Sequence, residues 1–368
     1  MRAAAVGLRD CWRVLTLVRQ SHALRERMAR PDLTYLFWEA TRRCNLRCVH
    51  CGSGCEAASP FAELTTDQIK AIVATIAEDF DARRIFVAIT GGEPMLRADL
   101  VEVVGYLSSL GMSPSMVTNG TLLGADEAAR LREAGMRAVA VSVDGLEKEH
   151  EAMRGRGTFL PAVRALGHAR QAGIELVEAI TCVRPDNLEQ LRQVEDCVRE
   201  AGATHWRLLT IDRMGRGVTR EARLWLDGAQ VKRLLDFVAE RRPVFLKSGE
   251  FDVSYSCGGF VGARRDAQVR ESGGCHAGLS IGSILCDGGV SACPSLPRDW
   301  IQGSALDTRF SELWRTRFTK HRSLEWRKEG PCADCSWFGV CMGGGLHERA
   351  VQPEEFCWLD RLDSAEAR

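Results

Sequence analysis

Short apolar runs alternate with helix-type periodicity along the chain from Tyr35 to Ile211. Strands are predicted at YLFWEAT (35–41), RIFVAIT (84–90), SPSMVTN (113–119), RAVAVSV (137–143), IELVEAITCV (174–183) and HWRLLTI (205–211). Helical patterns follow these strands, and the later ones lie near 97–110, 125–135, 158–172 and 187–201. Six strand–helix units predict an α/β fold with a parallel sheet. Six units make an open, partial (β/α)6 barrel, two units short of a closed TIM barrel.

The first helix after the cysteine-rich loop shows the clearest periodicity. Its apolar residues fall at i, i+3, i+4 and i+7, which are Ile69, Ile72, Val73 and Ile76. We expect these four side chains to face the sheet, and we expect Thr66 to cap the helix.

The alternation of strands and helices ends after Gly217, so we expect the chain to divide into four regions. We expect a basic helical extension over 1–33, the barrel over 34–225, a bridging helix and linker over 226–270, and a small cysteine-rich domain over 271–368. The last region is rich in glycine and has little periodicity, so we expect bound metal to stabilise it.

Composition excludes some partners. The chain has 49 Lys and Arg against 49 Asp and Glu, so its formal net charge is zero and it lacks the basic surface that nucleic acid binding requires. The first 32 residues contain arginines throughout and no unbroken apolar run, which argues against a signal peptide and predicts a cytoplasmic protein. We expect this N-terminal helix to pack on the domain that follows it, with contact to an anionic membrane as the alternative.

Three cysteines, Cys44, Cys48 and Cys51, follow directly on the first predicted strand. A closed structural zinc site needs four nitrogen or sulfur ligands, and three thiolates on a [4Fe–4S] cluster leave one iron open to an outside ligand. The carboxyl end of a barrel strand is also where active sites are built. A four-cysteine zinc site that includes Cys55 is the alternative.

The Cys44-x3-Cys48-x2-Cys51 pattern resembles the signature of the radical SAM superfamily. The resemblance implies that the open iron chelates S-adenosyl-L-methionine. It also implies that an electron from the cluster cleaves this cofactor to a 5′-deoxyadenosyl radical, which abstracts a substrate hydrogen.

Further motifs strengthen this resemblance and imply a set of cofactor-binding residues. TGGEP (90–94) resembles the family motif that binds the methionine amino group, SVDG (142–145) resembles its ribose-binding position, and DRMGRG (212–217) places an arginine where relatives hold the methionine carboxylate. The residues implied are Gly91, Gly92, Glu93, Ser142, Asp144 and Arg216.

The C-terminal cysteines resemble a SPASM domain, which carries one or two auxiliary [4Fe–4S] clusters. The resemblance assigns Cys332, Cys335, Cys341 and Cys357 to the second auxiliary cluster, and Cys275 and Cys293 to the first. Taken without this context, the four cysteines from 332 onward predict zinc.

The chain departs from the SPASM pattern at Gly345, where the family has a cysteine of the first cluster. Three outcomes remain open: an open-site cluster with Cys257 or Cys286, a cluster completed by a residue such as His347, or no first cluster. We expect a first cluster to be present. Cys11, Cys182 and Cys197 lie in helix or strand patterns, so we assign them to packing.

Three hypotheses about function follow. The first is a radical SAM enzyme that matures a ribosomally made peptide. The second is a radical SAM dehydrogenase or epimerase that acts on a small molecule, either an aminocyclitol sugar or a tetrapyrrole. The third is a zinc-stapled binding protein without catalysis. For the first two we expect an external electron donor such as flavodoxin or ferredoxin, whereas no residue is marked as the catalytic acid or base.

Overall fold

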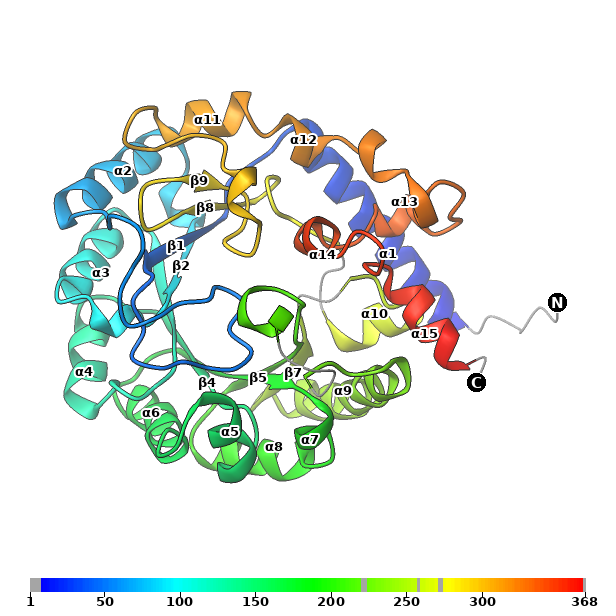
Figure 1. Ribbon diagram of the computed structural model, residues 1–368, viewed down its shortest axis with the longest axis horizontal. Coiled ribbons are helices and arrows are strands. Elements are labelled where there is room, and N and C mark those ends of the chain that lie inside the picture. Colours follow the sequence, from blue (N-terminus) through cyan, green and yellow to red (C-terminus); the bar gives the residue numbers. More distant parts are fainter. Residues whose placement is uncertain (1–7, 220–223, 257–258, 271–273, 367–368) are drawn as a thin grey trace.

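A single nine-stranded sheet organises the computed structural model, which describes residues 8–219, 224–256, 259–270 and 274–366 (Figure 1). The side chains of 8–17 and 363–366 lie outside this description. The strand order is β7-β6-β5-β4-β3-β2-β1-β8-β9, and every neighbouring pair is parallel except β8 and β9. The curved sheet with helices on its outer side confirms the partial barrel.

The barrel follows the predicted strand–helix order. Its strands are β1 (Tyr35–Thr41), β2 (Phe86–Gly91), β3 (Ser113–Thr118), β4 (Ala138–Ser142), β5 (Leu176–Val183) and β6 (His205–Thr210). Its helices are α2 (Thr66–Asp79), α3 (Leu100–Ser109), α4 (Ala125–Glu133), α5 (Glu147–Arg154), α6 (Phe159–Gln171), α7 (Pro185–Leu188) and α8 (Leu191–Glu200).

Helix α2 shows how the sequence pattern becomes packing. Its predicted face of Ile69, Ile72, Val73 and Ile76 is buried against the sheet, as expected. The expected cap was wrong by one residue. Thr65, not Thr66, is the N-cap. Its side chain accepts a hydrogen bond from the backbone N–H of Gln68, and the Gln68 side chain accepts one from the backbone N–H of Thr65. Thr66 instead donates its hydroxyl to Asp99, 2.6 Å away.

The remainder of the chain extends the same sheet at both edges. Its elements are α9 (Gly228–Ser248), β7 (Asp252–Tyr255), α10 (Ala263–Val269), β8 (Ile281–Ile284), β9 (Val290–Ser291), α11 (Phe310–Thr316), α12 (Thr319–Arg322), α13 (Phe338–Cys341), α14 (Leu346–Val351) and α15 (Trp358–Glu366). Strand β7 pairs with β6, and β8 pairs with β1. The sheet therefore continues from the predicted barrel into both the bridging segment and the cysteine-rich region.

The N-terminal helix α1 (Leu8–Ala29) lies against α10 and α13. Its Leu24 is buried with Leu279 and Met342, and Arg25 donates to the carbonyl of Gly339 at 3.0 Å. The described part of α1 therefore packs on the protein, as expected. Among the residues described, no helix has both the length and the apolar character needed to cross a membrane.

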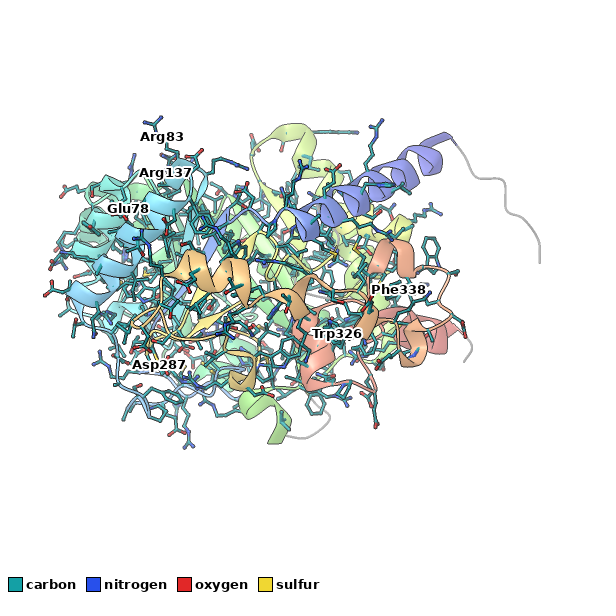
Figure 2. The ribbon with its side chains drawn as sticks, turned by 90° about the horizontal axis from the view of Figure 1, so that it is seen from above. Glu78, Arg83, Arg137, Asp287, Trp326 and Phe338 are labelled. Atoms are coloured by element: carbon teal, nitrogen blue, oxygen red, sulfur yellow. The ribbon has the colours of Figure 1, made fainter. Side chains whose placement is uncertain are left out.

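The cysteine-rich region extends from the barrel helix α2, which α11 contacts, to α9 and α1, which α15 and α13 contact. Figure 2 shows Glu78 and Arg83 at one end of the molecule and Phe338 displaced from them, on the side where α1 lies. In Figure 1 the loop between β1 and α2, drawn in blue, lies inside the ring of barrel strands and helices.

Candidate active site

The carboxyl ends of the six barrel strands surround one cavity of about 410 Å³, which we call the central cavity. Each strand supplies it with side chains, among them Phe37 from β1, Thr90 from β2, Val117 from β3, Ser142 from β4, Ile180 from β5 and Leu209 from β6. Cys44, Cys48 and Cys51 line the same space, and so does Cys293 from the C-terminal region. The cavity therefore lies between the strand ends, the cysteine loop and the loop after β9.

Arg216 holds the loop that carries the three cysteines. Its Nε donates to the carbonyl of Cys48 at 2.9 Å, and its Nη1 donates to the carbonyl of Cys55 at 2.7 Å. Its backbone N–H also donates to the carbonyl of Cys51 at 3.0 Å. The resemblance implied a contact of Arg216 with the methionine carboxylate. The arginine does line the central cavity, and its bonds to these carbonyls give it a role in fixing the loop.

The thiols of the loop differ in their surroundings. Burial raises the pKa of Cys44 and of Cys48, whereas a hydrogen bond from the Cys55 thiol lowers the pKa of Cys51. Nη1 of Arg154 lies 3.9 Å from the Cys48 sulfur, so a cation already faces this ligand position. Cys55 also lines the cavity, beside the predicted triplet.

Gly91, the last residue of β2, and Gly92, which follows it, let this part of the backbone approach the cysteine loop very closely. A Cβ on Gly91, whose φ is +132°, would lie 2.1 Å from the Thr41 carbonyl oxygen, and a Cβ on Gly92 would lie 2.0 Å from that of Arg43. The backbone N–H of Gly92 donates to Thr41 at 2.7 Å. We expected these glycines to admit a ligand. They line the cavity, but the close approach seen here is to the chain's own loop.

Glu93 is fully buried beneath the cavity wall. Its carboxylate accepts from the Thr118 hydroxyl at 2.7 Å and from the backbone N–H of Asn119 at 2.8 Å. Burial raises its pKa, although these hydrogen bonds oppose the shift. The carboxylate thus ties β2 to the end of β3, and the expected contact with an ammonium group stays a prediction.

The structure separates the two residues expected at the ribose. Ser142 lines the central cavity, whereas Asp144 is fully buried and is not among the lining residues. The Asp144 carboxylate accepts from Arg154 Nε at 2.6 Å and lies 3.3 Å from Nε2 of His50. Burial alone would raise the pKa of Asp144, but Arg154 and then His50 outweigh burial and lower it. Asp144 therefore lies behind the cavity wall and orients Arg154, which lines the cavity.

The four cysteines assigned to the second auxiliary cluster meet in one pocket. Cys332, Cys335, Cys341 and Cys357 line it together with Phe260, Phe338 and Phe356. Nη2 of Arg349 donates to the Cys332 sulfur at 3.1 Å. Four thiols that line one pocket match the number of ligands of a [4Fe–4S] cluster, and the assignment of these cysteines to that cluster stays a prediction.

The residues considered for the first auxiliary cluster are more dispersed. Cys293 lines the central cavity, and Cys275 packs against the main hydrophobic core. Cys286 is fully buried and faces Glu39, to which its backbone N–H donates at 3.4 Å. Cys257 lies outside the described residues. The presence of a first cluster therefore stays a prediction.

The other two positions considered there, Gly345 and His347, lie at the start of α14. Nε2 of His347 is 3.2 Å from a carboxylate oxygen of Asp212, just after β6. A Cβ on Gly345 would lie 2.8 Å from Oε2 of Glu348, so a carboxylate occupies the space that a side chain at 345 would need.

Sequence reasoning missed several residues of the central cavity, and two of them, Cys182 and Arg154, contact Asp144. Cys182, expected in packing, lines it, and its backbone N–H donates to Asp144 at 2.8 Å. Arg154, at the end of α5, also lines it, and no motif marked this residue. Cys197 is partly buried in α8, as expected for packing, and the side chain of Cys11 lies outside the described residues.

Comparison with known proteins identifies the family. The model of the radical SAM superfamily matches residues 38–198, and the model of the iron–sulfur cluster-binding SPASM domain matches residues 275–336. The mycofactocin maturase MftC of Mycolicibacterium smegmatis is 32% identical over 313 residues, 84% of this chain and 77% of that protein. An AdoMet-dependent heme synthase of Oleidesulfovibrio alaskensis is 30% identical over 332 residues, 85% of this chain and 82% of that protein.

Solved structures share the fold at lower identity. Streptococcus suis SuiB, bound to its precursor peptide SuiA, aligns with a TM-score of 0.70 at 16% identity, covering 91% of this chain and 76% of SuiB. The protein anSMEcpe, with AdoMet and a peptide bound, aligns with a TM-score of 0.68 at 20% identity, covering 92% and 95%.

The chain belongs to the radical SAM superfamily and carries a SPASM domain. It is therefore an enzyme whose cofactors are [4Fe–4S] clusters and S-adenosyl-L-methionine, and the third hypothesis, a binding protein without catalysis, is set aside. The residues present fit this cofactor set: three thiols open onto a cavity that also has apolar walls and a hydroxyl at Ser142.

Proposed function

We propose that the chain modifies a ribosomally made peptide by abstracting a hydrogen atom from one residue of it. Cys44, Cys48 and Cys51 would hold the radical SAM cluster. When bound, this cluster and S-adenosyl-L-methionine supply a carbon radical that removes hydrogen from the substrate. The side chains of Phe37 and Leu209 would exclude water from the central cavity, because such a radical reacts with whatever lies nearest.

The shape of the site carries this proposal. The central cavity adjoins two further hollows on either side of the β6 loop. The α15 hollow, of about 200 Å³, shares Thr210, Ile211 and Asp212 with it, and the loop hollow, of about 400 Å³, shares Glu39, Gly52, Ser53, Met214 and Pro294. Arg213 lines both hollows. An extended peptide advances about 3.3 Å per residue, so several residues could cross these hollows while one side chain enters the central cavity.

The relative MftC, whose name describes a maturase, supports a peptide substrate. The heme synthase relatives favour a second candidate, a tetrapyrrole. The guanidinium groups of Arg42 and Arg298 line the loop hollow, and both lie over the ring of Phe61. Guanidinium groups bind carboxylates in a planar, bidentate geometry, so this hollow could also receive propionate side chains.

The experiment compares the two substrate classes on one preparation. The protein is purified without oxygen, reconstituted with iron and sulfide, reduced with dithionite or with flavodoxin as electron donor, and given S-adenosyl-L-methionine. Synthetic peptides from short reading frames beside the gene and iron coproporphyrin III are the probes.

Substrate-dependent 5′-deoxyadenosine and a mass change in a peptide are expected. A mass change confined to the porphyrin would replace the first candidate with the second. The C44A/C48A/C51A variant is the control and should form no 5′-deoxyadenosine with either probe.

A further inference from the structure

Three side chains of types that can bind a metal ion lie close together beside the central cavity, between the end of β6 and the start of α14. They are Asp212, His347 and Glu348, and their ligand atoms all lie within 4.8 Å of one another. Nε2 of His347 is 3.2 Å from Oδ2 of Asp212. Asp212 lines both the central cavity and the α15 hollow, and Glu348 lines the α15 hollow.

Glu348 is the member of this group that points to a missing ligand. The residue is 3% exposed, and its Oε1 accepts from the indole N–H of Trp358. Its Oε2 is buried and has no hydrogen-bond partner among the described residues. A buried carboxylate oxygen without a donor or a cation is unfavourable, because nothing replaces the water that it gives up on burial. A ligand that supplied positive charge at Oε2 would remove this cost.

Two glycines leave the space around this oxygen clear of side chains. A Cβ on Gly345 would lie 2.8 Å from Oε2 of Glu348, and a Cβ on Gly259 would lie 3.0 Å from it. The SPASM pattern has cysteine at the position of Gly345. This chain therefore has no thiolate there and offers a carboxylate and an imidazole instead.

We propose that Asp212, His347 and Glu348 bind one divalent first-row transition-metal cation, distinct from the iron–sulfur clusters. Ligands about 2.1 Å from a tetrahedral metal are separated by about 3.4 Å, close to the spacing of Asp212 and His347, and a small rotation would bring Glu348 into the same shell. Two carboxylates and one neutral imidazole balance the charge of the cation.

The donor set indicates how the site would work. Mixed oxygen and nitrogen ligands suit Mn²⁺, Fe²⁺ and Zn²⁺, whereas clusters require thiolates. Three protein ligands leave a coordination position open, as in catalytic rather than structural metal sites. Glu348 and Asp212 both border the α15 hollow, so an anionic oxygen of a substrate could complete the coordination there. This inference holds for either candidate substrate.

Manganese is the probe for the test, because Mn²⁺ prefers oxygen and nitrogen ligands and does not compete for cluster thiolates. The reconstituted holoprotein is titrated with Mn²⁺ at room temperature, and the six-line electron paramagnetic resonance signal of free Mn²⁺ reports what remains unbound. E348Q and D212N each remove one ligand. E355Q is the matched control, because Glu355 lines the same hollow but is paired with Arg213 at 2.7 Å.

One Mn²⁺ per chain is expected to bind, and Zn²⁺ is expected to displace it. E348Q and D212N should each weaken binding at least about 100-fold, since even changes to outer-shell partners cost 10–100-fold. E355Q should bind as the wild type does, and iron content should be equal in all four proteins. Absence of Mn²⁺ binding would overturn the proposal, and the three side chains would then share a proton instead of a metal ion. Unchanged affinity in E348Q would overturn it as well, and so would loss of cluster iron in that variant.

Discussion

The substitution Gly92→Ala tests whether the glycine pair exists to hold the cysteine loop. The added Cβ would lie 2.0 Å from the carbonyl oxygen of Arg43 and 3.1 Å from Cβ of Cys44. The first contact involves two backbone segments, neither of which can rotate away as a flexible side chain would.

The size of the effect follows from that distance. Real Cβ atoms approach other heavy atoms no closer than about 3.0 Å, so the loop and the strand must separate by about 1 Å. A displacement of about 1 Å at a reacting centre costs about 100-fold in rate. The displaced residue is next to Cys44, so the cluster and its cofactor should both be affected.

The assay measures 5′-deoxyadenosine formed from S-adenosyl-L-methionine under dithionite, without substrate, together with iron and sulfide content. We expect G92A to form it about 100-fold more slowly. Gly105→Ala is the matched control, because nothing lies within 4 Å of its Cβ and it is in α3, where alanine stabilises a helix by about 1 kcal/mol. A G92A protein with wild-type iron and wild-type cleavage would refute this reasoning.

Three further substitutions have defined outcomes. Asp144→Asn should lower stability by about 3–5 kcal/mol, because it leaves the buried Arg154 without its charge partner, and a large drop in the thermal unfolding midpoint would show it. Cys335→Ser should lower iron content by about four atoms per chain, whereas Cys197→Ser should not, which iron analysis decides. His321 is fully buried with both ring nitrogens unpaired in the described chain, and burial lowers its pKa to about 4. As the pH falls from 6.5 to 4, His321 is protonated in the unfolded chain before it is protonated in the folded one. About 3 kcal/mol of the stability present above pH 6.5 should therefore be lost across that window. H321L should lose less, which unfolding measured at both pH values would show.

The barrel could be predicted because its signals are local. The strand predicted at 35–41 has those bounds in the structure, and the apolar spacing in α2 identified its buried face. The strands β7, β8 and β9 were missed because they have only two to four residues. In addition, β7 pairs with β6 and β8 pairs with β1, which lie far away in the sequence. Neighbouring threonines made the cap of α2 ambiguous, since only backbone geometry selects Thr65.

The residues of the site also fall into those that local sequence identifies and those that only the folded chain brings together. Spacing in the sequence grouped the cysteine triplet and the four cysteines from 332 onward, and each group lines one space in the structure. Their assignment to clusters stays a prediction. The position of Asp144 could not, because its burial depends on His50 and Arg154 from two other segments. Asp212 and His347 are separated by a long stretch of chain and belong to no motif that joins them, so only the folded chain brings them together.

We expect one iron of the cluster on Cys44, Cys48 and Cys51 to have no protein ligand. Electron paramagnetic resonance of the dithionite-reduced protein, recorded with and without S-adenosyl-L-methionine, tests it directly. The C332A/C335A variant removes the overlapping signal of the second auxiliary cluster. We predict that the cofactor shifts the spectrum of the C332A/C335A protein and that the C44A/C48A/C51A variant shows no shift. Identical spectra of the C332A/C335A protein with and without the cofactor would contradict it.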